Sequence, residues 1–229
     1  MPIVLTEIPA AAVPHVPPRK RWTRAECATL EASGLLDQES LELVEGELIG
    51  KTEKKRPHVD SFTLLQEWLA QVFGFRSVNV EAPIDVAPED NPTNEPVPDL
   101  IVLPQERPRF TSNPRALDLR LGVEIADTSL SFDLKVKVPL YARAGVREYW
   151  VLDVAGHRLL VHRNPQSVTY MDVAAYSARE RVAACSAAGT VPRGGCLPSP
   201  IAAVARIRRC PRNANAKQHR SEAKSNRAA

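Results

Sequence analysis

The chain has 229 residues, of which 44% are hydrophobic and 25% are charged. This balance is that of an ordinary globular protein, and it excludes a chain that is disordered throughout. No segment approaches the roughly 18 consecutive apolar residues that a membrane-spanning helix needs, so we expect no membrane association. The length suits one good-sized domain, with or without tails.

The formal net charge of +3 is the sum of two unlike regions. Residues 206–229 contain eight Lys or Arg side chains and one Glu, a net charge of +7. The other 205 residues contain 22 basic and 26 acidic side chains, a net charge of −4. The predicted globular part is therefore acidic. The basic end of the chain could hold polyanions without sequence preference, or be a solvated tail with no role.

Cysteines and the N-terminus give the expected compartment. The four cysteines form no Cys-x-x-Cys pair, and no histidine has zinc-finger spacing to them. The first 20 residues lack the charged segment and apolar core of a signal peptide. We therefore predict a cytoplasmic protein with reduced thiols and without a zinc site.

Composition also predicts the domain organisation. The 20 prolines cluster at 2–18, 83–114 and 192–211, where we expect tails and long loops. Hydrophobic periodicity is lost after residue 177, where Ala, Arg, Gly and Pro dominate. The prediction is a flexible arm over 1–21, a folded domain over 22–177, and a disordered Ala/Arg-rich basic tail over 178–229.

The first predicted elements are two helices and a hairpin. A helix is expected over 23–33, because Thr23 and Glu26 have capping-box spacing. Alternation around Glu-Gly predicts a hairpin or bulged strand pair over 41–51. Helical spacing of apolar residues predicts a helix over 57–73.

The remaining predicted elements are mostly strands. Residues 131–145 are expected to be helical, with a local kink at Pro139. Together these elements predict a mixed β-sheet flanked by helices, an α/β or α+β fold. The expected strands are at 77–86, 98–104, 119–126, 146–154, 157–164 and 168–177.

Two carboxylates occur where a chain rarely places them. Asp99 heads one apolar strand, and Glu124 lies inside another between Val123 and Ile125. Burying an ionised carboxylate without a partner costs several kcal/mol, so two on adjacent strands need a shared cation. Oxygen ligands without cysteine favour Mg²⁺ or Mn²⁺. The alternative is that each acid is solvated at a strand end, or pairs with a nearby Arg or Lys.

The next helix carries further candidates. Asp133, Lys137 and Tyr141 are four residues apart and line one face. A lysine beside a metal-bound acid pair can orient a water nucleophile or stabilise phosphate charge. An ordinary Asp-to-Lys helix pair, worth about 0.3–0.5 kcal/mol, is the alternative. By pattern alone, Glu42 is expected to be a solvated surface residue and His58 a capping or surface residue.

The sequence resembles the Uma-two type of restriction endonuclease, a family of the PD-(D/E)XK nuclease superfamily that is widespread in bacteria. The resemblance covers about residues 22–175. The longest motif combines an acid in a strand, a Ser/Thr-rich turn, Asp-x-x-x-Lys-x-x-x-Tyr, a Gly, and Glu-Tyr-Trp before a strand that ends in Asp. The residues that carry it are LELVEGEL (41–48), His58, VPDLIVL (97–103) and VEIADTSLSFDLKVKVPLYARAGVREYWVLDV (123–154).

The resemblance implies a restriction-endonuclease-like core and metal-dependent hydrolysis of nucleic-acid phosphodiesters, with DNA as the expected polymer. Asp99 and Glu124 match the two acids of the family, and Glu42 matches a further acid that would help hold Mg²⁺ or Mn²⁺. The usual superfamily lysine, two residues after the second acid, is replaced by Ala126. Lys137 would take over its role. Asp133, His58 and Tyr141 would be supporting residues.

Two function classes follow. The first is an endonuclease whose catalytic residues are Asp99, Glu124 and Lys137, with nucleic acid as partner; a homodimer would suit double-strand cleavage. The second is a binding or regulatory module that kept the fold and lost the chemistry, since a fold does not determine a function. Binding of Mg²⁺ or Mn²⁺ separates the two.

Overall fold

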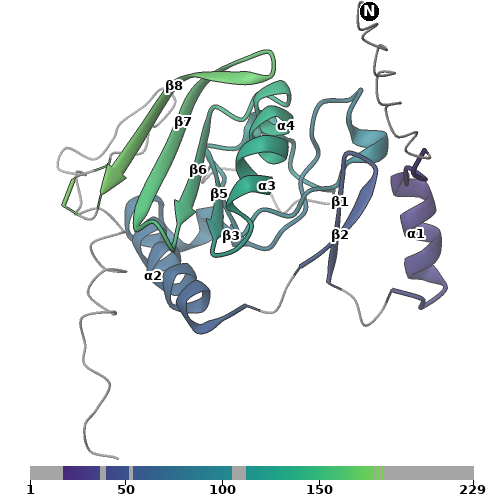
Figure 1. The fold of residues 1–229 in the computed structure, drawn as a ribbon, viewed down its shortest axis with the longest axis horizontal. Coiled ribbons are helices and arrows are strands. Elements are labelled where there is room, and N and C mark those ends of the chain that lie inside the picture. Colours follow the sequence, from purple (N-terminus) through teal and green to yellow (C-terminus); the bar gives the residue numbers. More distant parts are fainter. Residues whose placement is uncertain are drawn as a thin grey trace, which may run out of the picture.

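The computed structural model describes residues 18–36, 40–51, 54–104, 112–177, 179–180 and 182. A six-stranded mixed sheet forms the centre of the molecule, and helices lie on both of its faces (Figure 1). Most of the arm predicted over 1–21, and nearly all of the tail predicted over 178–229, lie outside the described residues. In the described part of the chain, no helix is long and apolar enough to cross a membrane.

The N-terminal elements form beside the main sheet. Helix α1 (Arg24–Ala32) begins with the predicted capping box, since Thr23 and Glu26 each bond the other's backbone N–H. Strands β1 (Leu41–Val44) and β2 (Glu47–Gly50) form the predicted hairpin. Both turn residues, Glu45 and Gly46, have positive φ, as a two-residue turn of the type I′ class requires.

The main sheet has the strand order β3-β4-β5-β6-β7-β8. Only β5 and β6 are parallel, and the helical segment 130–143 connects them. The other neighbouring pairs are antiparallel, so the sheet is mixed, as predicted. The strands are β3 (Val78–Val80), β4 (Leu100–Val102), β5 (Leu121–Ala126), β6 (Glu148–Asp153), β7 (Arg158–Gln166) and β8 (Thr169–Ser177).

Alternation along the strands produces two hydrophobic cores. Helix α2 (Arg56–Phe73) covers one face through Leu65, Trp68 and Leu69, and Val182 packs into the same core. The other face is covered by α3 (Leu130–Phe132), a π-helical turn (Asp133–Lys137) and α4 (Val138–Arg143). Residues of the central strands are buried on both faces, which explains why those strands read as continuous apolar runs.

Two predicted elements differ from the observed ones. The strand expected over 77–86 ends at Val80, because Glu81 has a φ of 45° and turns the chain out of the sheet. Ile84 and Val86 are nevertheless buried, as their alternation implied. The helix expected over 131–145 contains the π-helical turn directly before Pro139, where we expected a kink.

Candidate active site

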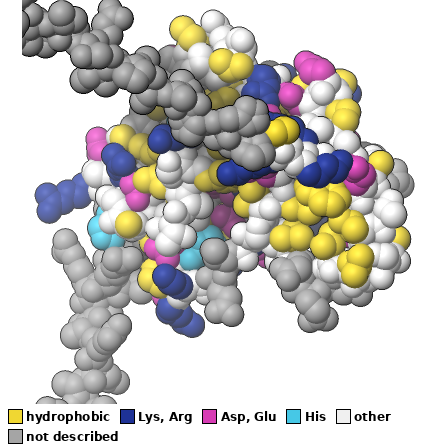
Figure 2. Space-filling view, turned by 45° about the vertical axis from the view of Figure 1, so that its right-hand side comes forward, with side chains coloured by type: hydrophobic (Ala, Val, Ile, Leu, Met, Phe, Trp, Pro, Cys, Tyr) yellow, Lys and Arg dark blue, Asp and Glu magenta, His cyan; other side chains and the backbone are white. Residues whose placement is uncertain are grey.

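A pocket of about 690 Å³ opens between the β1–β2 hairpin, the start of α2 and the end of β5. Acidic side chains are visible in a recess near the middle of the face in Figure 2, with Lys and Arg side chains close to its edge. The pocket is lined by five acidic and five basic or imidazole side chains, namely Glu42, Asp99, Glu124, Asp127, Asp133, Lys51, Lys54, Lys55, His58 and Lys137.

The register of β4 and β5 brings the two strand carboxylates together. Leu100 pairs with Val123, so Asp99 and Glu124 are the next residues opposite each other across the antiparallel pair. Both are buried, with 6% and 4% of their surface exposed. The N–H of Ile125 donates to Asp99 Oδ2 over 2.8 Å, which fixes that carboxylate against β5. The two acids are therefore neighbours at one edge of the pocket, as predicted from the apolar strands that carry them.

Glu42 reaches the pocket from the separate hairpin. Leu43 pairs with Glu95, and the N–H of Val97 donates to Glu42 Oε2 over 3.0 Å. Only 6% of Glu42 is exposed. The surface position that the strand pattern alone predicted for Glu42 is therefore wrong, because the segment that precedes β4 docks on the hairpin and covers this side chain.

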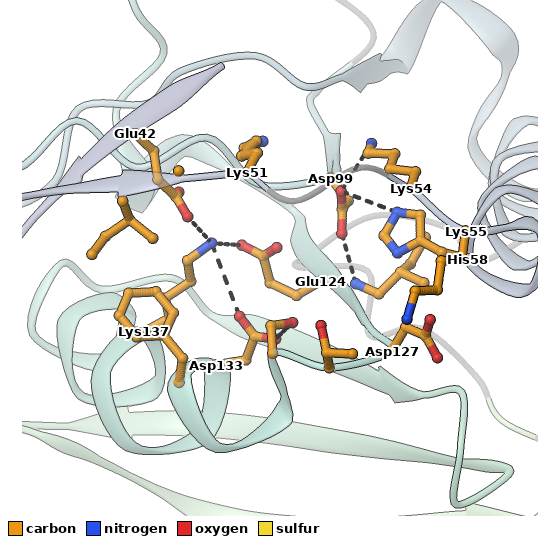
Figure 3. A pocket seen from close by; sticks show the side chains of 16 residues that line it. Glu42, Lys51, Lys54, Lys55, His58, Asp99, Glu124, Asp127, Asp133 and Lys137 are labelled. Atoms are coloured by element: carbon orange, nitrogen blue, oxygen red, sulfur yellow. Dashed lines mark hydrogen bonds and ion pairs between the residues drawn. The ribbon is translucent and has the colours of Figure 1, made fainter. Parts of the chain in front are cut away.

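Lys137 lies at the centre of the acidic side chains (Figure 3). Its ammonium Nζ is 2.9 Å from Glu42 Oε1, 2.9 Å from Glu124 Oε1 and 4.0 Å from Asp133 Oδ1. The N–H of Val138 donates to the carbonyl of Asp133, five residues back, which widens this turn of the helix. The turn directs both Asp133 and Lys137 inward, where both are buried.

The sequence left two alternatives open for Lys137, a place beside the strand acids or an ordinary helix pair with Asp133, and the structure combines them. Lys137 does pair with Asp133, but as a buried group that also bonds two acids from other elements, not as a solvated helix pair. Tyr141, one turn further along, lies just behind the pocket and donates to Glu124 Oε1 over 3.3 Å. Each predicted site residue is thus in the pocket or bonded to a residue that lines it.

Burial controls the ionisation of this cluster. Burial raises the pKa of Glu124 well above its usual range, and the nearby ammonium of Lys137 only partly offsets this. Burial likewise raises the pKa of Asp133. For Lys137, burial disfavours the charged form, but Glu124, Glu42 and Asp133 outweigh it and raise the pKa of the ammonium. Lys137 is therefore held as a cation beside two acids whose ionised forms burial disfavours.

His58 and Lys54 lie on the Asp99 side of the pocket. Lys54 Nζ is 3.4 Å from Asp99 Oδ1, and His58 Nε2 is 3.7 Å from the same oxygen. His58 is only 9% exposed, so the surface or capping position that we expected for it is wrong. It is the third residue of α2, and the cap position before the helix is occupied by Lys55.

Sequence reasoning missed the basic side of the pocket. Lys51, Lys54 and Lys55 line it opposite the helical segment that carries Lys137 (Figure 3). Their signal was the basic run at 51–56, directly before the helix that carries His58. Basic side chains around an acidic floor suit a polyanionic ligand, because they can contact phosphates beside a reacting group.

The chemistry of these donors fits a hard divalent cation. Glu42, Asp99, Glu124 and Asp133 supply four carboxylates, against two ammonium groups within 4.0 Å of them, those of Lys54 and Lys137. Among the described residues, no group of three or more Asp, Glu, His or Cys side chains is already arranged to hold a metal. Mg²⁺ seldom needs such a cage, since one or two carboxylates, waters and substrate phosphates complete its shell.

Comparison with known proteins identifies the family of this chain and a solved structure with a similar fold. Residues 27–189 match the Uma2 family model, described as "Putative restriction endonuclease". The fold is similar to a crystal structure described as a putative nuclease belonging to DUF820 from Anabaena variabilis, with 19% identity and a TM-score of 0.55. That alignment covers 73% of this chain and 90% of the other. No curated protein matches. The expected restriction-endonuclease-like core, a mixed sheet with flanking helices, is confirmed.

Proposed function

The chain belongs to the Uma2 family, and from this premise we propose that it is a metal-dependent endonuclease that hydrolyses DNA phosphodiester bonds. One observation carries the proposal beyond the family. Asp99 and Glu124 are neighbours across β4 and β5, and Lys137 contacts Glu124 at 2.9 Å in the same pocket. This is the set of groups that phosphodiester hydrolysis needs, brought together from three separate elements.

Asp99 and Glu124 are the residues that would hold Mg²⁺ or Mn²⁺, with Glu42 as a further acid. When bound there, the ion would supply Lewis-acid chemistry, by acidifying a water molecule and neutralising charge on the scissile phosphate. The peptide N–H of Ile125 orients the carboxylate of Asp99, so this ligand is held before substrate arrives.

Lys137 contributes a fixed positive charge. Its ammonium is held by Glu42 and Glu124, so it does not have to be ordered when substrate binds. A preorganised cation of this kind can orient the attacking water and stabilise the charge that develops on the phosphate. Tyr141 and Asp133 support this position by bonding Glu124 and flanking the ammonium.

Lys51, Lys54 and Lys55 are proposed to contact the phosphates beside the scissile bond. They line the pocket from the hairpin and the start of α2, on the side opposite Lys137. Such contacts carry no sequence information, and they place the nucleic-acid backbone over the acidic floor. An otherwise acidic domain can therefore still contact DNA phosphates through these three lysines.

The direct test is nicking of supercoiled plasmid DNA with Mg²⁺ or Mn²⁺. We expect wild type to cleave, and Asp99→Asn and Glu124→Gln to lose at least about 100-fold in rate, since a metal ligand supports several kcal/mol of charge stabilisation. Asp172→Asn changes an exposed acid on β8, far along the sheet, and is the matched control that should retain activity.

Two outcomes would contradict the proposal. Equal cleavage by wild type and Asp99→Asn would remove the assigned site. Binding of DNA without cleavage in either metal would instead support a regulatory module that kept the nuclease fold.

A further inference from the structure

His58 is a buried polar residue that has no role in the reaction proposed above. It lies on α2, and its imidazole lines the pocket beside Asp99 (Figure 3). The residue is 9% exposed, and its buried Nε2 atom has no hydrogen-bond partner among the residues that the structure describes. An unpaired buried polar atom costs free energy, so this nitrogen requires an explanation.

The imidazole ring also lies beside the backbone of Ile125 on β5. Burial lowers the pKa of His58, and the nearby carboxylate of Asp99 only partly offsets this. A neutral ring with its proton on Nδ1 presents a lone pair at Nε2.

In this tautomer, two acceptors face each other across a short gap. His58 Nε2 is 3.7 Å from Asp99 Oδ1, an oxygen that also accepts from Lys54 Nζ over 3.4 Å, while Asp99 Oδ2 accepts from the N–H of Ile125. Ligand bonds of roughly 2.1 Å allow one ion to contact two atoms that are up to about 4.2 Å apart. The pair has the spacing of two ligands of one cation, and the N–H of Ile125 holds Asp99 in place.

We propose that His58 Nε2 is a ligand of the divalent cation together with Asp99, and that it makes the site prefer Mn²⁺ to Mg²⁺. The proposal deepens the proposed function and rests on it for the presence of a metal at this pocket. The preference follows from ligand chemistry. Mg²⁺ takes oxygen ligands almost exclusively, whereas a first-row transition ion accepts an imidazole nitrogen beside carboxylates.

Pulsed electron paramagnetic resonance of Mn²⁺ bound to the untagged full chain tests the proposal. We expect the echo envelope of wild type to show nitrogen modulation from a directly bound imidazole. The modulation should vanish in His58→Gln and persist in His157→Asn. His157 is an exposed histidine at a φ of 52°, a conformation that asparagine tolerates, so it is a matched control.

Calorimetry of metal binding gives a second readout. His58→Gln should weaken Mn²⁺ by at least about tenfold, the scale on which even outer partners of a ligand act, and should change Mg²⁺ affinity by less than about threefold. Equal weakening of both ions would overturn the proposal, since it would indicate a purely structural histidine.

The wild-type spectrum decides the matter even if the variant folds poorly. Bound Mn²⁺ without nitrogen modulation would overturn the role of His58 while leaving plasmid cleavage and the acidic ligands intact. A wild-type chain that binds no Mn²⁺ would overturn both this inference and the metal dependence on which it rests.

Discussion

Glu124 is both a proposed metal ligand and a buried acid that weakens the metal-free fold. Burial raises its pKa, so the folded chain retains this proton to a higher pH than the unfolded chain, which loses it near 4.5. Between these two pKa values the unfolded state binds fewer protons, and stability therefore falls as pH rises. Below the unfolded value the acid is neutral in both states and has no such effect.

Glu124→Gln should therefore stabilise the metal-free protein while abolishing cleavage. The difference in free energy of unfolding from wild type should be near zero at pH 4. Between the unfolded and the folded pKa of Glu124, this difference should grow by about 1.4 kcal/mol for each pH unit. Above the folded pKa it should level off. Urea denaturation in EDTA between pH 4 and 8 measures it. A variant less stable than wild type at pH 8 would contradict this reading of the cluster.

Lys137 has the opposite effect, because it is the cation that its acidic neighbours already require. Lys137→Met should destabilise the metal-free protein by about 3–5 kcal/mol at pH 8, as loss of one partner of a buried pair does. Saturating Mg²⁺ should then raise the melting temperature of this variant more than that of wild type, since the ion replaces the missing charge.

The control for this prediction is Lys135→Met, an exposed lysine two residues away on the same helical segment. It should be close to wild type in stability and in its response to Mg²⁺. If Mg²⁺ raises the melting temperature of Lys137→Met no more than that of wild type, the ammonium and the ion do not share the same carboxylates.

At the scale of elements, the β1–β2 hairpin is the part that delivers Glu42. Gly46 has a φ of 75°, and a Cβ atom there would lie 3.0 Å from Arg21 Cβ. Gly46→Ala should destabilise the protein by about 1–3 kcal/mol, the cost of a strained left-handed residue, and should lower cleavage by shifting Glu42. Gly50→Ala, in the same hairpin, has ordinary φ and only Leu41 Cδ2 at 3.9 Å, so its unfolding midpoint should stay near wild type.

Most elements could be predicted from sequence because their signals are local. The capping box at Thr23, the Glu-Gly turn and the apolar runs of β4 and β5 each act over a few residues, and all formed as expected. The strand expected to reach residue 86 failed because alternation reports burial, and Ile84 is buried without being paired in the sheet. The π-helical turn before Pro139 directs Asp133 and Lys137 inward, and periodicity does not encode such a turn.

The site shows the same division between local and tertiary signals. Asp99 and Glu124 were predictable, because an acid in an apolar strand is anomalous wherever that strand is placed. Glu42 and His58 were not, since their burial depends on the segment that docks on the hairpin and on the contact between α2 and β5. The pattern around each of them alone is that of a surface residue.

At the scale of the whole molecule, charge is distributed unevenly along the chain. Residues 206–229 have a net charge of +7, lie outside the described residues, and extend beyond the family match, which ends at 189. If this segment contacts DNA, its deletion should reduce the slope of log affinity against log salt, by at most about six for seven phosphate contacts. Fluorescence anisotropy with a labelled duplex measures the slope, and an unchanged slope and affinity at low salt would exclude a binding role.

The homodimer expected for double-strand cleavage stays a prediction at this scale.

The proposed function depends on a divalent cation held by the carboxylates of this pocket. The most direct measurement is anomalous diffraction from a crystal of the full chain soaked in Mn²⁺. We expect a peak between Asp99 and Glu124, within bonding distance of both carboxylates, and no such peak in Asp99→Asn crystals soaked alike. A wild-type crystal with no peak in this pocket, or with manganese bound only elsewhere, would contradict it.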